Sequence, residues 1–527
     1  MTLGEPRGGP DEGSRPLPGR TRGLLLFCAS ALVFQAAIAS GRIGNIDTFN
    51  QLVASVHLLD TGHLAIDGDD FESRIVPVLP ESAGPSGDGT NGWVRSSDGD
   101  WYQAHDPGNK VLLTTGALAS RVAGRQPVGQ ADPTDTTKVL ANVATGAFAA
   151  LLPVLLFLGL RFVMPVRRAM SWATLGLVAT ILLPYSNRTW DVYPAAVLVA
   201  GVAWLGVRRL SQSDSSKRGC AAMFVVAALA SWFRFSLAAF LLAGCVLTEV
   251  VSARRARTLG QPATWWRLAG GTVAFAVVLT PVLVLNAAAT GNPLRPPIAT
   301  FAENQPLERF PLAGAFGLIG SPNRGLLWFS PILLLALWLP LAWRSLSPVV
   351  RAFTLAWVLP VGGYLLAVGS ISNWGAFGWG PRYLVPVIPL LWLPVAAVGS
   401  HLLSVSSATR LVTVVLLSMS VIIGAVAAVT NWEGVAGLSS AAIARDRAYP
   451  AQIVETFSYV GRDIPIESDD VAEDGVDAGR WPDLALLHGA RDAGVPDALG
   501  YIGFAILIAV AAALLRAARD ASPAHHT

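Results

Sequence analysis

The chain has 527 residues, of which 53% are hydrophobic and only 14% are charged. A soluble globular protein carries about 25% charged residues, so the composition excludes an ordinary soluble protein. The formal net charge of +3 gives no reason to expect a nucleic-acid partner.

The predicted elements begin with a tail. Residues 1–22 are rich in Gly, Pro and Arg, which predicts a disordered segment. The apolar run that follows is long enough to cross a hydrocarbon core of about 30 Å, and no clear small-residue cleavage site comes after it. We therefore expect an uncleaved signal-anchor. Similar runs recur along the chain, and we predict twelve transmembrane helices, near 23–40, 138–160, 169–184, 192–207, 219–232, 235–251, 268–288, 325–343, 350–368, 383–400, 411–430 and 499–516.

The distribution of charge orients these spans. With the N-terminus in the cytoplasm, the inside segments hold 20 of the 38 Lys and Arg residues but only 6 of the 35 Asp and Glu residues. Cytoplasmic loops of membrane proteins carry such an excess of Lys and Arg. We expect both termini to be cytoplasmic.

Three predicted outside segments are too long to be simple turns: 41–137, 290–324 and 431–498. The first contains two helical candidates, "DTFNQLVASVHLL" and "NKVLLTTGALASRVAG", which we expect to lie in the outer membrane interface because each is amphipathic or too weakly apolar to span. The stretch between them is rich in Gly, Pro, Ser and Asp and is predicted to be loop. The third segment is acidic, and we expect it to pack on the outer face as a loop.

Unusual polar and aromatic clusters all fall on this predicted outer face. "PYSNRTWDVYP" places Arg188 and Asp191 at one helix end, and "SISNWGAFGWGPRYLVPVIP" places Trp374, Trp379, Arg382 and Tyr383 at another. Such clustering is typical of an active site at the membrane surface and not of a pore through its middle.

Five stretches carry a resemblance to a known family. They are "GNIDTFNQL" with Asp47, "WYQAHDPGNKVLL", "YSNRTWDVYP", "SPNRGLLWFSPILLL" and "NWGAFGWGPRYLVPVIPLL". In order and composition, residues 23–400 resemble the GT-C membrane glycosyltransferases, in particular bacterial relatives of the protein O-mannosyltransferases and lipid A aminoarabinose transferases. Many members carry an acidic pair in the first loop, but Thr48 follows Asp47 here. We therefore expect no metal site and no cofactor.

The resemblance implies a division of roles. Asp47 becomes the candidate base, although Asp at this position is also a favoured helix N-cap. Candidates for the donor phosphate are Arg382 first, then Arg324, Arg188 and Lys110, which could instead anchor lipid headgroups. Candidates for sugar or acceptor contact are His105, Asp106, Asp191, Trp374, Trp379 and Tyr383. The alternative roles are a turn for His105 and Asp106, an ion pair for Asp191, and an aromatic belt for the two tryptophans and the tyrosine.

The expected function is an inverting transfer of a sugar from a polyprenyl-phosphate donor to a cell-envelope glycan, lipid or protein at the outer face of the bacterial plasma membrane. The catalytic unit would occupy residues 23–430, with 431–498 as an acidic loop and 499–527 as a last span and tail. The alternative is a transporter or lipid flippase, which predicts charged residues near span midpoints. The predicted spans carry few.

The predicted orientation can be tested with reporter fusions at Gly89 and Gly461, which lie in the first and third outside segments. We expect both fusions to report an extracytoplasmic position, because the Arg-rich loops between the helices favour the cytoplasmic side and so fix the orientation of the helices. A cytoplasmic signal from either fusion would contradict the orientation.

Overall fold

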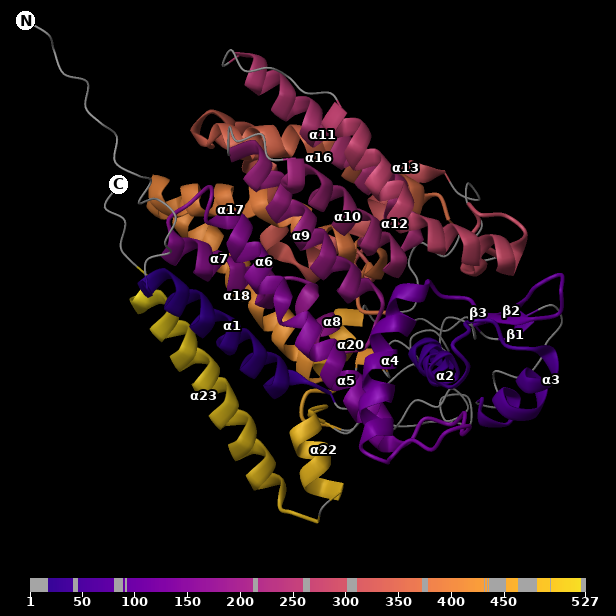
Figure 1. The fold of residues 1–527 in the computed structure, drawn as a ribbon. Coiled ribbons are helices and arrows are strands. Elements are labelled where there is room, and N and C mark those ends of the chain that lie inside the picture. Colours follow the sequence, from indigo (N-terminus) through magenta and orange to yellow (C-terminus); the bar gives the residue numbers. More distant parts are fainter. Residues whose placement is uncertain are drawn as a thin grey trace, which may run out of the picture.

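The computed structural model describes residues 18–40, 46–79, 89–90, 92–211, 217–258, 266–300, 310–371, 378–430, 432–433, 435, 452–462, 481–492 and 494–522. Within these ranges the chain is mostly helical and contains one small antiparallel sheet (Figure 1). The helices form a bundle, and the sheet lies with α2 and α3 in a lobe at one side of it (Figure 1).

Nine helical segments of the described chain are long and apolar enough to cross a membrane. They correspond to nine of the predicted spans, which confirms an all-α polytopic membrane protein. The helices that make them up are α1 (Pro18–Ile38), α5 (Asp135–Ala149) continued by α6 (Leu151–Leu160), α9 (Val192–Ser211), α11 (Ala238–Thr258), α12 (Trp266–Thr290), α16 (Pro348–Gly369), α17 (Ile388–Val405), α18 (Ser407–Val429) and α23 (Asp497–Ala521).

The other three predicted spans form shorter or interrupted helices. Residues 219–232 lie in α10 (Lys217–Phe233), residues 169–184 are divided between α7 (Val166–Val178) and α8 (Leu182–Ser186), and residues 325–343 form α14 (Leu326–Phe329), the 3-10 segment Pro331–Trp338 and α15 (Leu339–Ala342). Two of the breaks meet at Ser330, whose Oγ accepts a hydrogen bond from the Ile181 backbone N–H at 2.8 Å. A backbone group freed at a break must find a partner inside the protein, and the side chain at one interruption supplies that partner for the other.

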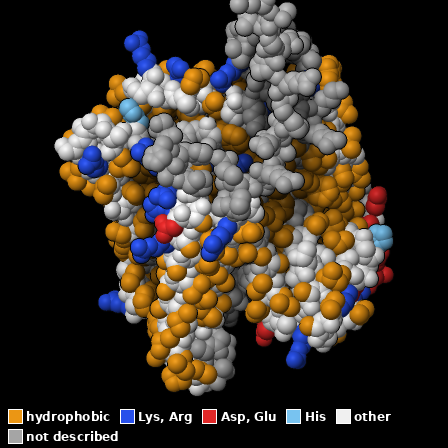
Figure 2. All heavy atoms as spheres, turned by 60° about the vertical axis from the view of Figure 1, so that its left-hand side comes forward, with side chains coloured by type: hydrophobic (Ala, Val, Ile, Leu, Met, Phe, Trp, Pro, Cys, Tyr) orange, Lys and Arg blue, Asp and Glu red, His pale blue; other side chains and the backbone are white. Residues whose placement is uncertain are grey.

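The first and last long helices lie side by side, so the two ends of the described chain share one edge of the bundle (Figure 1). Ser30 of α1 donates a hydrogen bond to the Ala511 carbonyl of α23 at 2.7 Å. Figure 2 shows a flank of the molecule on which apolar side chains cover much of the surface. On α23, for example, Leu499, Ile502 and Ile506 are more than half exposed. A lipid environment suits such a surface.

The first outside segment is more ordered than the sequence predicts. Both helical candidates are present, as α2 (Ile46–Thr61) and α4 (Pro107–Val122), and a loop was expected between them. The structure instead has a short helical stretch that begins with α3 (Gly68–Asp70), followed by β1 (Gly89–Thr90), β2 (Trp93–Arg95) and β3 (Trp101–Gln103) in the order β1-β2-β3. Buried aromatic rings hold this lobe together, because the ring of Phe71 stacks on Trp101 at 4.3 Å and meets the edge of Trp93 at 5.2 Å.

The apolar stripe of α2 packs against protein. Leu52 contacts Leu113 of α4 and Ala141 of α5, and Val53 joins the aromatic cluster of the lobe. These side chains have no exposed surface. This face of α2 therefore packs against protein, whereas the sequence predicted that it would lie in the membrane interface. The packing fixes the start of α2, and with it Asp47, against the bundle.

The contact between α4 and α5 depends on a glycine. A Cβ atom at Gly116 would lie 2.4 Å from the Ala141 Cα, whereas a Cβ at Gly146, further along α5, would meet nothing within 4 Å. Gly116→Ala is therefore expected to lower the free energy of unfolding by about 1–3 kcal/mol, the usual cost of overpacking. Gly146→Ala is the matched control and should be neutral. Thermal unfolding in detergent measures both, and equal midpoints for the two variants would contradict the packing.

Candidate functional site

The predicted base Asp47 lies in the first turn of α2 with its side chain 31% exposed. Its Oδ1 is 3.3 Å from His105 Nε2, and its Oδ2 is 3.9 Å from Arg382 Nη1. The fold thus brings together residues that are far apart in the sequence. Although packing removes part of its hydration, His105 and Arg382 lower the pKa of the Asp47 carboxyl below its ordinary value. It is a carboxylate at neutral pH.

His105 bridges two carboxylates. It lies in the turn that leads into α4, and its Nδ1 is 3.8 Å from Asp191 Oδ2, on the opposite side of the ring from Asp47. Burial opposes the charged imidazole, but the carboxylates of Asp47 and Asp191 outweigh it and raise the pKa of His105 to about 9. His105 is therefore an imidazolium at neutral pH, with one N–H directed at each carboxylate.

Arg234 belongs to the same cluster, although nothing in the sequence analysis singled it out. It lies between α10 and the 3-10 turn Phe235–Leu237, and its Nη1 is 3.7 Å from Asp191 Oδ2. The turn is held by Asp106, whose Oδ2 accepts a hydrogen bond from the Phe235 N–H at 3.0 Å. The one available signal was weak: a single Arg in a two-residue connection on the predicted outer face.

Arg382 and Arg234 approach the same aromatic ring. The guanidinium carbon of Arg234 lies 4.9 Å from the centre of the Tyr383 ring, and that of Arg382 lies 5.3 Å from it. Arg382 also lies 4.9 Å from the centre of the Trp190 ring. Both arginines are about nine-tenths buried, and in the described part of the chain the Nε of each and the Nη2 of Arg234 have no hydrogen-bond acceptor. Buried N–H groups without an acceptor are uncommon and favour an anionic ligand.

The cluster carries an excess of positive charge. We call Asp47, His105, Asp191, Arg234 and Arg382 the charged cluster. Its three cations and two carboxylates leave one net positive charge in a largely buried place. The arginines and His105 also keep the pKa of Asp191 well below its ordinary range against the effect of burial. A buried unbalanced charge is costly, so the arrangement suits a bound anion beside the carboxylate of Asp47.

Lys110, a candidate for the donor phosphate, contacts oxygen atoms of neighbouring residues. Its Nζ donates to the Gln103 carbonyl at 3.0 Å, to the Gln103 Oε1 at 3.1 Å and to the His105 carbonyl. A lysine ammonium has three hydrogens, and these contacts occupy all of them. Burial lowers the pKa of Lys110 to about 7, and burial raises that of the neighbouring Asp106 to about 6. Lys110 holds the turn that carries His105.

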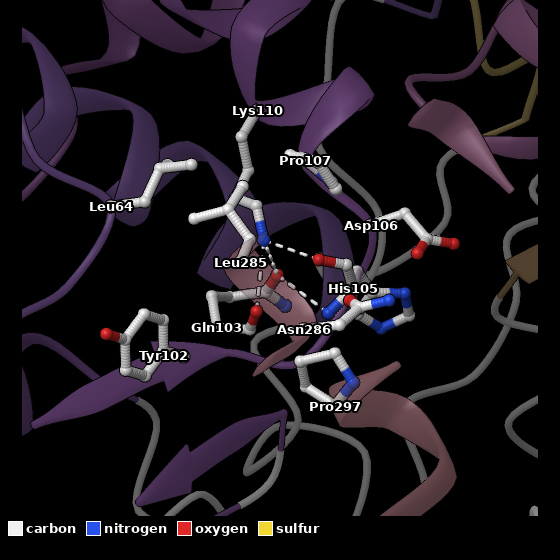
Figure 3. A pocket seen from close by; sticks show the side chains of 10 residues that line it. All are labelled: Leu64, Tyr102, Gln103, His105, Asp106, Pro107, Lys110, Leu285, Asn286 and Pro297. Carbon is white, nitrogen blue, oxygen red and sulfur yellow. Dashed lines mark hydrogen bonds between the residues drawn. The ribbon is translucent and has the colours of Figure 1, made fainter. Parts of the chain in front are cut away.

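Figure 3 shows this turn beside a small cavity, with Lys110 directed at Gln103 and His105. The cavity lies between the β3–α4 connection and the end of α12. Its lining residues are Leu64, Tyr102, Gln103, His105, Asp106, Pro107, Lys110, Leu285, Asn286 and Pro297.

Three more of the predicted site residues lie in the described part of the chain but are not members of the charged cluster. Arg188 is 2% exposed and forms ion pairs with Asp483 and Glu433. The ring of Trp379 is fully buried against Phe329 at 4.8 Å, so it is closed to a sugar. Arg324 donates to the Gly378 carbonyl near Arg382. Trp374 lies outside the described residues.

Solved structures similar to this chain include two of one bacterial protein. No family model and no curated protein sequence matches the chain. The crystal structure of ArnT from Cupriavidus metallidurans bound to undecaprenyl phosphate matches at 16% identity with a TM-score of 0.46, over 94% of this chain and 76% of the other. The apo structure of the same protein matches at 13% identity with a TM-score of 0.39, over 94% and 77%.

The imidazolium of His105 predicts a pH-dependent stability. Because the pKa of His105 is raised from 6.5 to about 9, its contribution is fully present below pH 6.5 and is lost as the pH rises through 9. We expect the thermal midpoint of the wild type to exceed that of His105→Gln at pH 6 and the difference to shrink by pH 10. Unfolding scans in detergent across this range measure it. A difference independent of pH would show that His105 is not charged.

Proposed function

We propose that this protein is an inverting glycosyltransferase that takes its sugar from a polyprenyl-phosphate donor at the outer face of the membrane. The charged cluster carries the proposal. It combines a partly exposed carboxylate with two buried guanidiniums whose N–H groups are incompletely used. Such a site can accept a proton on one side and hold a phosphate on the other.

Asp47 is the proposed base. His105 contacts Oδ1, which orients the carboxylate, and Oδ2, which lies 3.9 Å from Arg382 Nη1, accepts the proton of the acceptor hydroxyl. The hydroxyl oxygen then attacks the anomeric carbon of the sugar as the bond from that carbon to the phosphate oxygen breaks. The electron pair of that bond leaves with the phosphate. One displacement of this kind inverts the anomeric configuration.

The leaving group is a polyprenyl phosphate monoester, whose second pKa is near 6, so no general acid is needed. The departing oxygens do need cations. Arg382 and Arg234 are placed to supply them, since a guanidinium pairs with phosphate oxygens in a forked geometry. Tyr383 and Trp190 lie against these guanidiniums and hold them, so we assign Tyr383 to the arginines and not to the sugar. Arg324, near the same turn, remains a further candidate for the phosphate.

The membrane supplies the donor lipid. The described chain has nine helices that are able to span a bilayer, and the charged cluster lies where their predicted outer connections meet. A donor with its isoprenoid tail in lipid would present its phosphate at this level. In this proposal the sugar binds between Asp47 and the phosphate held by the arginines, so the acceptor hydroxyl attacks from the side opposite the leaving group.

The test is turnover by the purified protein with a panel of polyprenyl-phosphate sugars, arabinose and mannose first. Asp47→Asn should lower kcat by about 10²–10⁴-fold, the usual contribution of a general base. Arg382→Ala should raise the KM for the donor by about 10–100-fold, because it removes a charge-assisted hydrogen bond worth about 1.5–3 kcal/mol.

Matched controls are Asp98→Asn, an exposed carboxylate in the turn between β2 and β3, and Arg295→Ala, an exposed guanidinium after α12. Both should retain wild-type kinetics. Full activity of Asp47→Asn, or no turnover with any donor of the panel, would reject the proposed function.

A further inference from the structure

The backbone turn before Arg382 is held by side chains from three other parts of the chain. The turn runs from Gly378 to Gly380, and Gly380 has a φ of +58°, in the left-handed region that favours glycine. The Trp379 carbonyl accepts a hydrogen bond from the Tyr185 hydroxyl at 3.0 Å. The Arg382 N–H then donates to the Gly380 carbonyl at 3.0 Å. The geometry of the turn therefore fixes the backbone position of Arg382.

Gln452 binds both sides of this turn. Its Nε2 donates to the Gly378 carbonyl at 3.0 Å, and its Oε1 accepts from the Gly380 N–H at 3.1 Å. One amide thus pairs with a carbonyl and an N–H two residues apart, as a backbone strand would. Arg324 Nη1 lies 3.5 Å from the same Oε1. Gln452 is 3% exposed, and hydrogen bonds of this kind are costly to break when one partner stays buried.

Gln452 comes from the acidic segment 431–498, in the helix α20 (Gln452–Ser458). A second residue of that segment reaches Arg382 by another route. Glu433 accepts a hydrogen bond from the Trp190 indole N–H at 2.6 Å, and Arg382 lies over the Trp190 ring. Two residues of the segment, Gln452 and Glu433, therefore each bind a group that adjoins Arg382: the preceding turn and the Trp190 ring.

We propose that Gln452 is a positioning residue that sets the guanidinium of Arg382 for binding the phosphate group of a polyprenyl phosphate. The inference rests on the proposed function, in which Arg382 contacts that phosphate. It assigns a role in substrate binding to a segment that the sequence marks only by its acidity. Gln452 does not touch the lipid; it acts through the turn.

The experiment measures binding of undecaprenyl phosphate to the full chain in detergent, with undecaprenol as the uncharged comparison. Gln452→Met keeps the size of the side chain but removes both hydrogen bonds to the turn. We expect the affinity for undecaprenyl phosphate to be about tenfold weaker, which corresponds to about 1.4 kcal/mol. The affinity for undecaprenol should not change. Ser458→Ala, at an exposed position of the same helix, is the matched control and should bind as the wild type does.

A double-mutant cycle then tests whether Gln452 acts through Arg382. In the Arg382→Ala background, Gln452→Met should cause no further loss. An undiminished loss there, or wild-type affinity of Gln452→Met alone, would overturn the inference. If Gln452→Met does not fold, Gln452→Glu takes its place, because it keeps the acceptor for Gly380 but sets an oxygen against the Gly378 carbonyl, and the same loss is expected.

The two proposals fail differently. If the wild type does not distinguish undecaprenyl phosphate from undecaprenol, or if Arg382→Ala binds it normally, the proposed phosphate site is wrong. If the wild type prefers the phosphate, Arg382→Ala weakens that preference and Gln452→Met leaves it intact, only the positioning role is wrong.

Discussion

The imidazolium of His105 between the carboxylates of Asp47 and Asp191 is the interaction on which the site depends. It joins the start of α2, the turn before α4 and the start of α9. None of these segments could place a charged group in a buried position alone, because an isolated buried ion loses its hydration without compensation. Together, the three charges compensate one another, and each also fixes the orientation of its neighbour.

The charged cluster is nevertheless not neutral, and its excess positive charge is what allows it to bind an anion in the proposed function. Arg234 and Arg382 add two positive charges near Asp191 and Asp47, and aromatic rings cover the guanidiniums where no acceptor does. Aromatic faces stabilise cations by electrostatic attraction while leaving N–H groups free to bind an anion. A site built only of balanced ion pairs would have nothing left for a phosphate.

Charged residues of one type serve different purposes in this fold, and their partners decide which. Lys110 and Arg188 are as deeply buried as Arg382. Lys110, however, donates to neighbouring backbone and amide oxygens, and Arg188 pairs with Glu433 and Asp483. Both maintain the surroundings of the charged cluster. Arg382 is instead held from behind, by the turn that Gln452 binds, and its end points toward Asp47.

By itself, the sequence determined the membrane class, the approximate position of most spans and several members of the site. Long apolar runs must become helices in a bilayer, since each helix satisfies its backbone hydrogen bonds within one segment, and this local rule can be read without tertiary structure. The resemblance in short motifs also pointed to Asp47, His105, Asp191 and Arg382, which the fold brings together.

Only the tertiary structure decided which charges belong to the cluster and which support it. Arg234 had no motif around it, and the acceptors of Arg188 lie 245 and 295 residues further along the chain, as their numbers show. The aromatic lobe of Phe71, Trp93 and Trp101 was hidden in a sequence with the composition of a loop. The physical reason is common to all of these: burial and electrostatic pairing depend on distances in space, and long-range packing sets those distances.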